Sequence, residues 1–195
     1  MTDLKSFLGL LLIVTVLIPG PASAEGMYLF LKAGVFQIGD EHYVPDDSWT
    51  NSVLNITPQS DESSAFGMEW TVMDEWLIGF ELYHTVHEWR SPQGNSGEIE
   101  ASSMLFSCKQ MFLPKAIINP YVGAGFGWSV ISMDTGDAWD DQDSFMLHFG
   151  VGAIMKFGKV STFLELRHMD AIFAMSFADY RYYGDGVYGG IRLEL

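Results

Sequence analysis

Residues 120–130 read Pro-Tyr-Val-Gly-Ala-Gly-Phe-Gly-Trp-Ser-Val, and apolar side chains alternate in this stretch with small or polar ones. The apolar positions are Val122, Ala124, Phe126, Trp128 and Val130. Successive side chains of a β-strand point to opposite faces of the sheet. The stretch therefore predicts a strand with one apolar face and one small or polar face.

The same period of two occurs in eight segments, each about as long as a tilted strand that crosses a bilayer, roughly ten residues. The segments are residues 27–39, 63–73, 76–88, 101–113, 120–132, 144–156, 160–170 and 186–195. Antiparallel strands of this length and number are typical of a small barrel.

Nine charged residues of these segments can all be placed on the small or polar face. They are Lys32, Glu69, Glu81, Lys109, Lys156, Glu165, Arg167, Arg192 and Glu194. A soluble barrel with its apolar face inside would expose these charges and the glycines over a core of Trp, Phe and Leu. We therefore interpret the apolar face as lipid-facing. The nine charges are expected to form a structural network in the interior, because an eight-stranded barrel is only just wide enough for side chains to fill and buried charges need partners.

The lengths of the connections favour a membrane barrel. Those after the second, fourth and sixth segments are short, whereas those after the first, third, fifth and seventh are about ten to twenty-three residues long. Outer-membrane barrels have an even number of strands, short periplasmic turns and long external loops, and closure leaves no unpaired edge in lipid. The sequence predicts an all-β, eight-stranded, antiparallel, up-and-down transmembrane β-barrel.

The first 24 residues are typical of a secretory signal peptide. Lys5 precedes an uncharged apolar run, and the segment ends in Ala22-Ser23-Ala24, a small-x-small cleavage site. We expect cleavage between Ala24 and Glu25 and export through the periplasm. Residues 25–195 then form one outer-membrane barrel domain.

The mature chain is strongly acidic. Without Asp3 and Lys5 it carries 24 of the 25 acidic and 9 of the 10 basic residues. The strand charges nearly balance, so the acidic excess lies in the loops, and such a surface repels nucleic acid. The expected partners are outer-membrane lipid, lipopolysaccharide and the barrel-assembly machinery, with divalent cations at the acidic loops. No cofactor is expected.

Several stretches carry a family resemblance. They are the start YLFLKAGVF, the hairpin GMEWTVMDEWLIGFEL, the strand NPYVGAGFGWSV, the segment FLELRHMD and the closing GGIRLEL. With them the mature chain resembles small outer-membrane barrels of the OmpA-barrel and OmpW kind. The hairpin and the glycine-rich strand are most similar to OmpW, which implies a narrow barrel with a hydrophobic side passage for small apolar molecules. OmpW-like chains usually end in an aromatic residue, whereas this chain ends Leu193-Glu194-Leu195.

Two candidate metal sites have simpler interpretations. His84 and His87, beside Glu88, would chelate a metal on a helix, but in a strand they point to opposite faces. Asp134, Asp137, Asp140, Asp141 and Asp143 lack the Asp-x-Asp-x-Asp-Gly order of a calcium loop, which favours a solvated acidic loop. No metal site is predicted.

An enzyme of the lipid A deacylase kind needs a serine within hydrogen-bond reach of a histidine. His168 has the lipid-facing parity late in the chain, but Met-Asp-Ala follows it and Ser176 is eight residues downstream. No catalytic residue is predicted. Cys108 is expected to pack in the lipid-facing surface. Aromatic residues near the strand ends are expected in the girdles of the barrel, namely Tyr28, Trp70, Trp76, Trp89, Tyr121 and Trp128.

Three functions remain, each with its own structural expectation. A non-enzymatic barrel that serves envelope structure or surface interaction predicts a lumen filled by the charged side chains. An OmpW-like conduit for small hydrophobic molecules predicts an apolar cavity that opens sideways near the outer rim, under the loop of residues 40–62. A lipid A-modifying enzyme predicts a hydroxyl and a base together on the lipid-facing rim. We rank them in this order.

Overall fold

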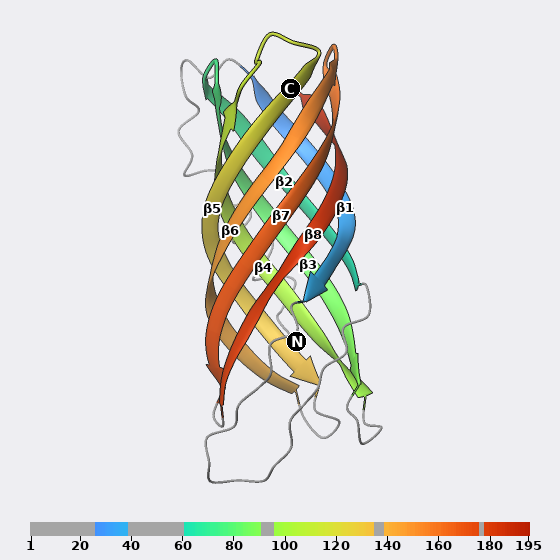
Figure 1. The fold of residues 1–195 in the computed structure, drawn as a ribbon, viewed down its shortest axis with the longest axis vertical. Coiled ribbons are helices and arrows are strands. Elements are labelled where there is room, and N and C mark those ends of the chain that lie inside the picture. The colour runs from blue at the N-terminus through green and yellow to red at the C-terminus, as the bar shows by residue number, and fades with distance from the viewer. Residues whose placement is uncertain (1–25, 39–60, 91–95, 135–138, 176–177) are drawn as a thin grey trace.

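The computed structural model describes residues 26–38, 61–90, 96–134, 139–175 and 178–195. These residues form one closed antiparallel barrel, in which each strand pairs with the next and β8 pairs with β1 (Figure 1). The strands are β1 (Met27–Ile38), β2 (Asp61–Met73), β3 (Trp76–Arg90), β4 (Ser96–Met111), β5 (Ile118–Asp134), β6 (Trp139–Phe157), β7 (Val160–Met175) and β8 (Ala178–Glu194). The predicted fold class is confirmed. In the described part of the chain no helix is long and apolar enough to cross a membrane.

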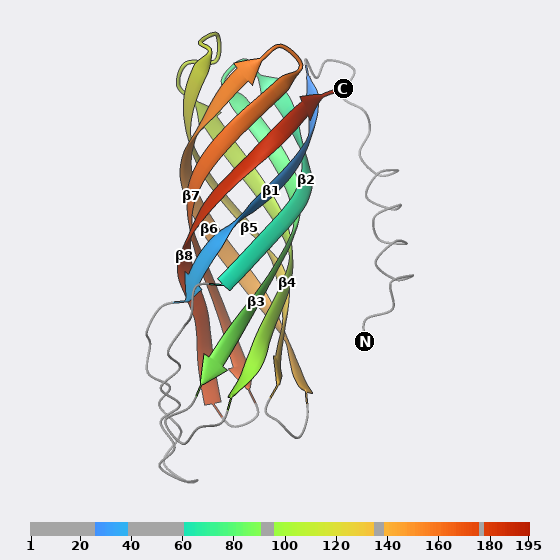
Figure 2. The same ribbon diagram turned by 90° about the vertical axis from the view of Figure 1, so that its right-hand side faces the viewer.

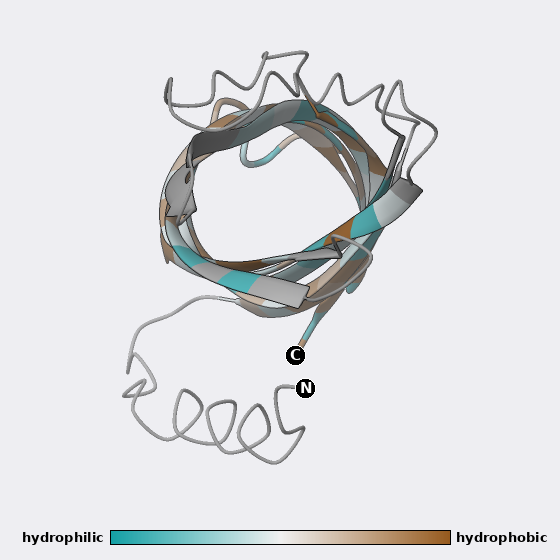
Figure 3. Ribbon diagram, turned by 90° about the horizontal axis from the view of Figure 1, so that it is seen from below, coloured by the Kyte–Doolittle hydropathy of each residue, from teal (hydrophilic) through white to brown (hydrophobic). Residues whose placement is uncertain are grey.

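The pairing of β1 with β8 closes the barrel. Their register runs from Tyr28 opposite Glu194 to Ile38 opposite Gly184, and Figure 2 shows β8, β1 and β2 side by side in this wall. Seen along the axis, the strands form a ring (Figure 3). Pairing on both edges of every strand satisfies the backbone groups that a bilayer would leave without water.

The apolar face of the strands points outward. On β7 Leu164 and Leu166 are exposed, whereas Glu165 and Arg167 between and beside them are buried at 1% and 3% exposure. The same alternation holds on β5, where Phe126 and Trp128 are exposed and Ser129 is buried. This arrangement is the reverse of a soluble protein, and it makes the barrel wall suited to lipid.

The strands extend further than the sequence predicts at one end, which we call the loop end. The connections 91–95, 135–138 and 176–177 are short there, and among the connections only 39–60 is long. The expected alternation of short and long connections is therefore wrong after the third, fifth and seventh strands. The apolar alternation stops at the bilayer surface, but antiparallel pairing continues into water, where neither face requires apolar side chains.

The predicted acidic loop is affected by the same extension. Asp134 ends β5, and Asp140, Asp141 and Asp143 lie in β6 rather than in a loop. The Ser132 hydroxyl donates a hydrogen bond to Asp141 Oδ1 at 2.6 Å across this hairpin. Asp137, the predicted signal peptide of residues 1–24, the Ala24–Glu25 cleavage site and most of the loop of residues 40–62 lie outside the described residues.

Two of the six aromatic residues expected in the girdles point into the barrel instead. Tyr121 is buried, and Tyr28 packs against the interior cluster that contains Tyr121. Each lies at one of the alternate positions whose side chains point into the barrel, so it is inside even though it lies near a strand end. Trp76 and Trp128 are exposed on the outer wall and Trp70 is half-buried, whereas the side chain of Trp89 lies outside the described residues.

Two apolar layers fill the ends of the lumen. The layer at the end with the turns 74–75, 112–117 and 158–159, the turn end, consists of Phe30, Leu77, Met111, Tyr121, Ile154 and Phe163. A larger layer lies toward the loop end and includes Phe36, Tyr83, Ile99, Ile131, Met146, Met169 and Tyr182. Most of the buried charges lie between these two layers, whereas Arg192 lies at the turn end, over the Tyr28 ring.

The outward band makes a depth-dependent prediction. Leu166 is exposed on β7, and its partners in the register, Val151 and Val187, are exposed apolar residues too. An arginine at a bilayer midplane costs about 2–4 kcal/mol of unfolding free energy, and one near the interface costs about 0–1 kcal/mol. We expect Leu166→Arg to show the larger loss and Val160→Arg, beside the turn at 158–159, the smaller one. Guanidinium unfolding in lipid vesicles, followed by tryptophan fluorescence, measures both. Equal losses would contradict this placement of the bilayer.

Candidate functional site

The interior of the barrel contains seven charged side chains that are 1% to 7% exposed. They are Lys32, Glu69, Glu81, Lys109, Glu165, Arg167 and Arg192, from strands β1, β2, β3, β4, β7 and β8. All seven belong to the nine charges that the sequence places on the polar face. Strand parity directs them inward, and barrel closure then brings them within reach of one another.

Glu81 and Arg167 form the central pair of this network. Arg167 Nη1 donates to Glu81 Oε1 at 2.7 Å and Nη2 donates to Oε2 at 3.1 Å, a two-pronged geometry that strengthens a charged hydrogen bond. The two residues come from β3 and β7, which lie opposite each other in the ring of eight strands. The pair therefore spans the lumen. Lys32 from β1 approaches the same carboxylate, with Nζ 2.9 Å from Oε1.

Glu165 links this pair to the rest of the network. Its Oε1 lies 2.7 Å from Arg167 Nη2 and 3.2 Å from Lys32 Nζ. Its Oε2 lies 3.2 Å from Lys109 Nζ and accepts a hydrogen bond from the Tyr121 hydroxyl at 2.7 Å. Both oxygens of this buried carboxylate are thus satisfied.

Glu69 terminates the chain of charges toward the turn end. Its Oε1 lies 2.8 Å from Lys109 Nζ, and its Oε2 lies 2.9 Å from Arg192 Nε. The Arg192 guanidinium also stacks over the Tyr28 ring at 4.1 Å, which explains the inward position of that tyrosine. Three carboxylates thus alternate with four cations, leaving one positive charge in excess.

Two charges expected in the interior network lie outside it. Lys156 is half-buried at the turn end, where its Nζ donates to the Pro114 carbonyl at 2.7 Å. Glu194 is half-buried at the last position of β8. Both have the inward parity, but they lie at the rim, where the lumen opens to solvent.

A layer of hydrogen-bonded tyrosine and histidine side chains lies on the loop-end side of the ion pairs, and sequence reasoning missed it. Tyr83 and Tyr188 share a hydrogen bond of 2.9 Å between their hydroxyls, and His87 Nε2 lies 2.7 Å from the Tyr182 hydroxyl. These contacts join β3 to β8 across the lumen. The inward parity of Tyr83 and Thr85 was visible in the sequence, but their partners depend on barrel closure.

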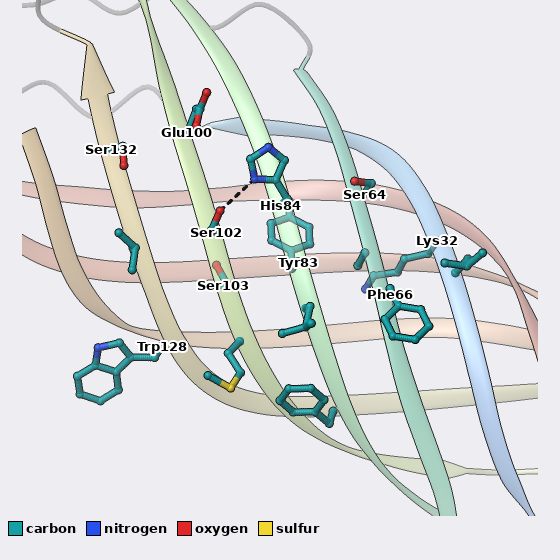
Figure 4. Close-up of a pocket in the computed structure, with 16 residues that line it drawn as sticks. Lys32, Ser64, Phe66, Tyr83, His84, Glu100, Ser102, Ser103, Trp128 and Ser132 are labelled. Atoms are coloured by element: carbon teal, nitrogen blue, oxygen red, sulfur yellow. Dashed lines mark hydrogen bonds between the residues drawn. The ribbon is translucent and has the colours of Figure 1, made fainter. Parts of the chain in front are cut away.

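The outer wall has a groove beside β2, β3, β4 and β5. Its cavity volume is about 670 Å³, and apolar side chains that include Phe66, Phe80, Leu82, Met104 and Trp128 line it (Figure 4). At its loop-end edge His84 Nδ1 lies 3.1 Å from Ser102 Oγ. His84 is exposed on this wall and His87 is buried in the lumen, on opposite faces as the strand geometry requires.

The remaining sequence candidates lie on the outer wall too. His168 is on β7, and its Nδ1 lies 2.9 Å from Asp185 Oδ1 of β8. Ser176, its possible partner in a deacylase, lies outside the described residues. Cys108 is exposed on the lipid-facing side of β4. In the described residues no group of three or more His, Cys, Asp or Glu side chains could hold a metal ion.

Known structures share this architecture. The crystal structure of Neisserial surface protein A (NspA) is similar over 89% of this chain and 99% of that chain, with a TM-score of 0.62 and 15% sequence identity. The solid-state NMR structure of the outer membrane protein AlkL in lipid bilayers is similar over 91% and 94%, with a TM-score of 0.54 and 13% identity. The chain has the fold of the small outer-membrane β-barrels.

A third structure extends this likeness. Ail, the attachment invasion locus protein of Yersinia pestis, is similar over 88% of this chain and 100% of that chain, with a TM-score of 0.52 and 10% identity. The sequence matches no protein family model and no curated protein. The resemblance to small outer-membrane barrels is thus confirmed at the level of the fold. The likenesses do not single out the OmpW-like subfamily.

The ion-pair network predicts strong coupling between Glu81 and Arg167. Removing one partner of a buried pair typically costs about 3–5 kcal/mol, because the other charge is left buried without compensation. We expect Arg167→Gln and Glu81→Gln each to lower the unfolding free energy by about that amount. The double variant should lose clearly less than the sum of the two. Guanidinium unfolding of the refolded barrel in detergent micelles measures this cycle. Additive losses would contradict the pairing, and Lys156→Gln, at the rim, serves as the matched control.

Proposed function

We propose that the protein is an integral outer-membrane barrel with a closed lumen, and that it serves envelope structure or surface interaction rather than passage through its interior. The single observation that carries this proposal is the Glu81–Arg167 pair, which joins opposite strands across the lumen. An eight-stranded barrel has room for little besides such side chains.

The layers on either side of the ion pairs support a closed lumen. Toward the loop end the hydrogen-bonded Tyr83 and Tyr188 are followed by buried Phe36, Met146 and Tyr182. Toward the turn end Phe30 and Phe163 pack edge to face with their centroids 6.2 Å apart. An ion that crossed the barrel would have to displace two apolar layers and break several buried ion pairs. The lumen then acts as a structural brace and performs no chemistry.

A side passage for small hydrophobic molecules ranks second. The groove on the outer wall is apolar and opens toward lipid, as such a passage requires. Behind it, however, β2, β3, β4 and β5 remain paired to beyond Ser102, and the register shift between Thr71 and Met73 of β2 lies near the turn end, away from the groove. A molecule in the groove is therefore separated from the lumen by a hydrogen-bonded wall, which favours a binding surface over a conduit.

The proposed partners follow from the two chemical surfaces of the barrel. The outward apolar band suits outer-membrane lipid, and insertion would require the barrel-assembly machinery. Glu98, Asp141 and Asp143 are exposed on the strand extensions. We infer that divalent cations bridge these carboxylates to lipopolysaccharide phosphates.

A planar-bilayer recording tests the closed lumen. The refolded wild-type barrel should give no steady, discrete conductance steps, because the charged side chains fill the lumen. Glu81→Gln and Arg167→Gln should lower the temperature at which the folded barrel unfolds in gel electrophoresis, since both break the brace.

Lys156→Gln should leave the unfolding temperature unchanged, because Lys156 bonds only the Pro114 carbonyl among its described contacts. Steady wild-type openings whose conductance changes in Glu81→Gln would overturn the closed-lumen proposal and place transport first.

A further inference from the structure

The groove on the outer wall lies against lipid, not solvent. Outward side chains of β2, β3, β4 and β5 make up most of its lining, together with Leu31 of β1 and the inward residues Lys32, Ala65, Tyr83 and Ser103 at its base. Its volume of about 670 Å³ is in the range of small-molecule sites. Phe80 packs in its floor against Phe106, with ring centroids 5.3 Å apart, and is buried although it has the outward parity. In a membrane, a hollow of this kind has the size and apolar lining to hold a hydrocarbon chain.

The groove ends where the outward side chains change from apolar to polar. The change from apolar to polar occurs at the same register position on three neighbouring strands. It runs from Phe66 to Ser64 on β2, from Leu82 to His84 on β3 and from Met104 to Ser102 on β4. The step marks the border between the hydrocarbon region and the headgroup region of the bilayer. Ester bonds of membrane lipids lie at that border, directly above their acyl chains.

A histidine and a serine meet at this border. His84 and Ser102 are directly opposite in the register of β3 and β4, and His84 Nδ1 lies 3.1 Å from Ser102 Oγ. Figure 4 shows the pair at the upper edge of the groove, with Phe66 and Trp128 below it and Glu100 above it. A hydroxyl within hydrogen-bond reach of a base is the arrangement that nucleophilic catalysis requires.

We propose that Ser102 and His84 form an acyl-ester hydrolase site for lipopolysaccharide of the outer leaflet. The groove holds one ester-linked acyl chain, and the ester carbonyl then lies at the Ser102 hydroxyl. This activity goes beyond the structural function of the lumen, because it uses only the outer wall. The loop end faces the cell exterior in barrels of this fold, where the lipid of the adjoining leaflet is lipopolysaccharide.

The reaction needs water as its only co-reactant. Ser102 Oγ attacks the ester carbonyl carbon while His84 Nδ1 accepts the hydroxyl proton. The bond from the acyl carbon to the lipid alcohol breaks, and His84 returns the proton to the departing oxygen, which leaves an acyl ester on Ser102. Water then attacks this ester, His84 passes the water proton to Ser102 Oγ, and the fatty acid departs. The polar edge of Ser64, Glu100 and Ser132 gives water access to the pair.

This pair is not the His168 and Ser176 combination, which the sequence argues against. His168 has the lipid-facing parity too, but its hydrogen bond is to the Asp185 carboxylate at 2.9 Å, so that contact joins a base to an acid without a nucleophile. The two histidines lie on different walls, His84 on β3 and His168 on β7. His168→Asn is therefore a matched control, since it removes an outward histidine whose hydrogen bond among the described residues is to a carboxylate and not to a hydroxyl.

The first measurement is fatty acid release. The mature wild-type barrel is refolded into vesicles of lipopolysaccharide and phosphatidylethanolamine, and free fatty acids are quantified by mass spectrometry. We expect release from lipopolysaccharide, a loss of at least about 100-fold in Ser102→Ala and His84→Asn, and no change in His168→Asn. Release that persists in Ser102→Ala would overturn the proposal. So would release from phosphatidylethanolamine alone in vesicles without lipopolysaccharide.

The second measurement detects the nucleophile itself. A fluorophosphonate probe should modify Ser102 in the wild type, identified by peptide mass spectrometry, and the modification should disappear in His84→Asn. Heat-modifiable migration in gel electrophoresis verifies that each variant is folded. A folded wild type that neither releases fatty acid nor reacts at Ser102 would reduce the pair to a polar contact at the membrane border and overturn the proposal.

Discussion

A bilayer offers no water to the peptide groups inside it, and this constraint determines the rest of the structure. Every strand must be hydrogen-bonded on both edges, so β8 has to return to β1. Eight strands closed in this way enclose a lumen that side chains can fill. When the apolar face of each strand points to lipid, its polar face must point into the lumen. Closure of the barrel therefore buries the charged side chains, and each of them needs a partner of opposite charge to offset the loss of water.

The ion pairs in turn restrict how the barrel can deform. Glu81 and Arg167 come from opposite strands, while Glu165 contacts cations from β1, β4 and β7. A wall that moved outward would have to separate charges in a region of low dielectric. The aromatic rings of Tyr28, Tyr121 and Tyr188 lie close to the cations and add further partners. The interior therefore stabilises one cross-section of the barrel and leaves the outer wall as the surface available for contacts with other molecules.

Strand parity could be predicted from the sequence because it depends only on period two, and it placed Lys32, Glu81 and Arg167 on the inner face. The partners could not be predicted, since they depend on which strands are opposite and on how far neighbouring strands are staggered. Tyr121 was assigned to the girdle from its position near a strand end, whereas its parity directed it to Glu165. The His84–Ser102 contact required the register between β3 and β4, which no local pattern encodes. The strand ends were missed because, beyond the bilayer, both faces meet water and the apolar signal disappears.

Because the strands extend beyond the membrane border, molecules outside the cell contact paired strands as well as loops. From Ser102 to the start of β4 at Ser96 the strand continues for roughly 20 Å along its axis, and β3 accompanies it. The hairpin tip is thus held on a stiff stalk of paired backbone rather than on a loose tether. A macromolecule that approached the barrel from this side would therefore contact paired strands and the exposed carboxylates of Glu88 and Glu98.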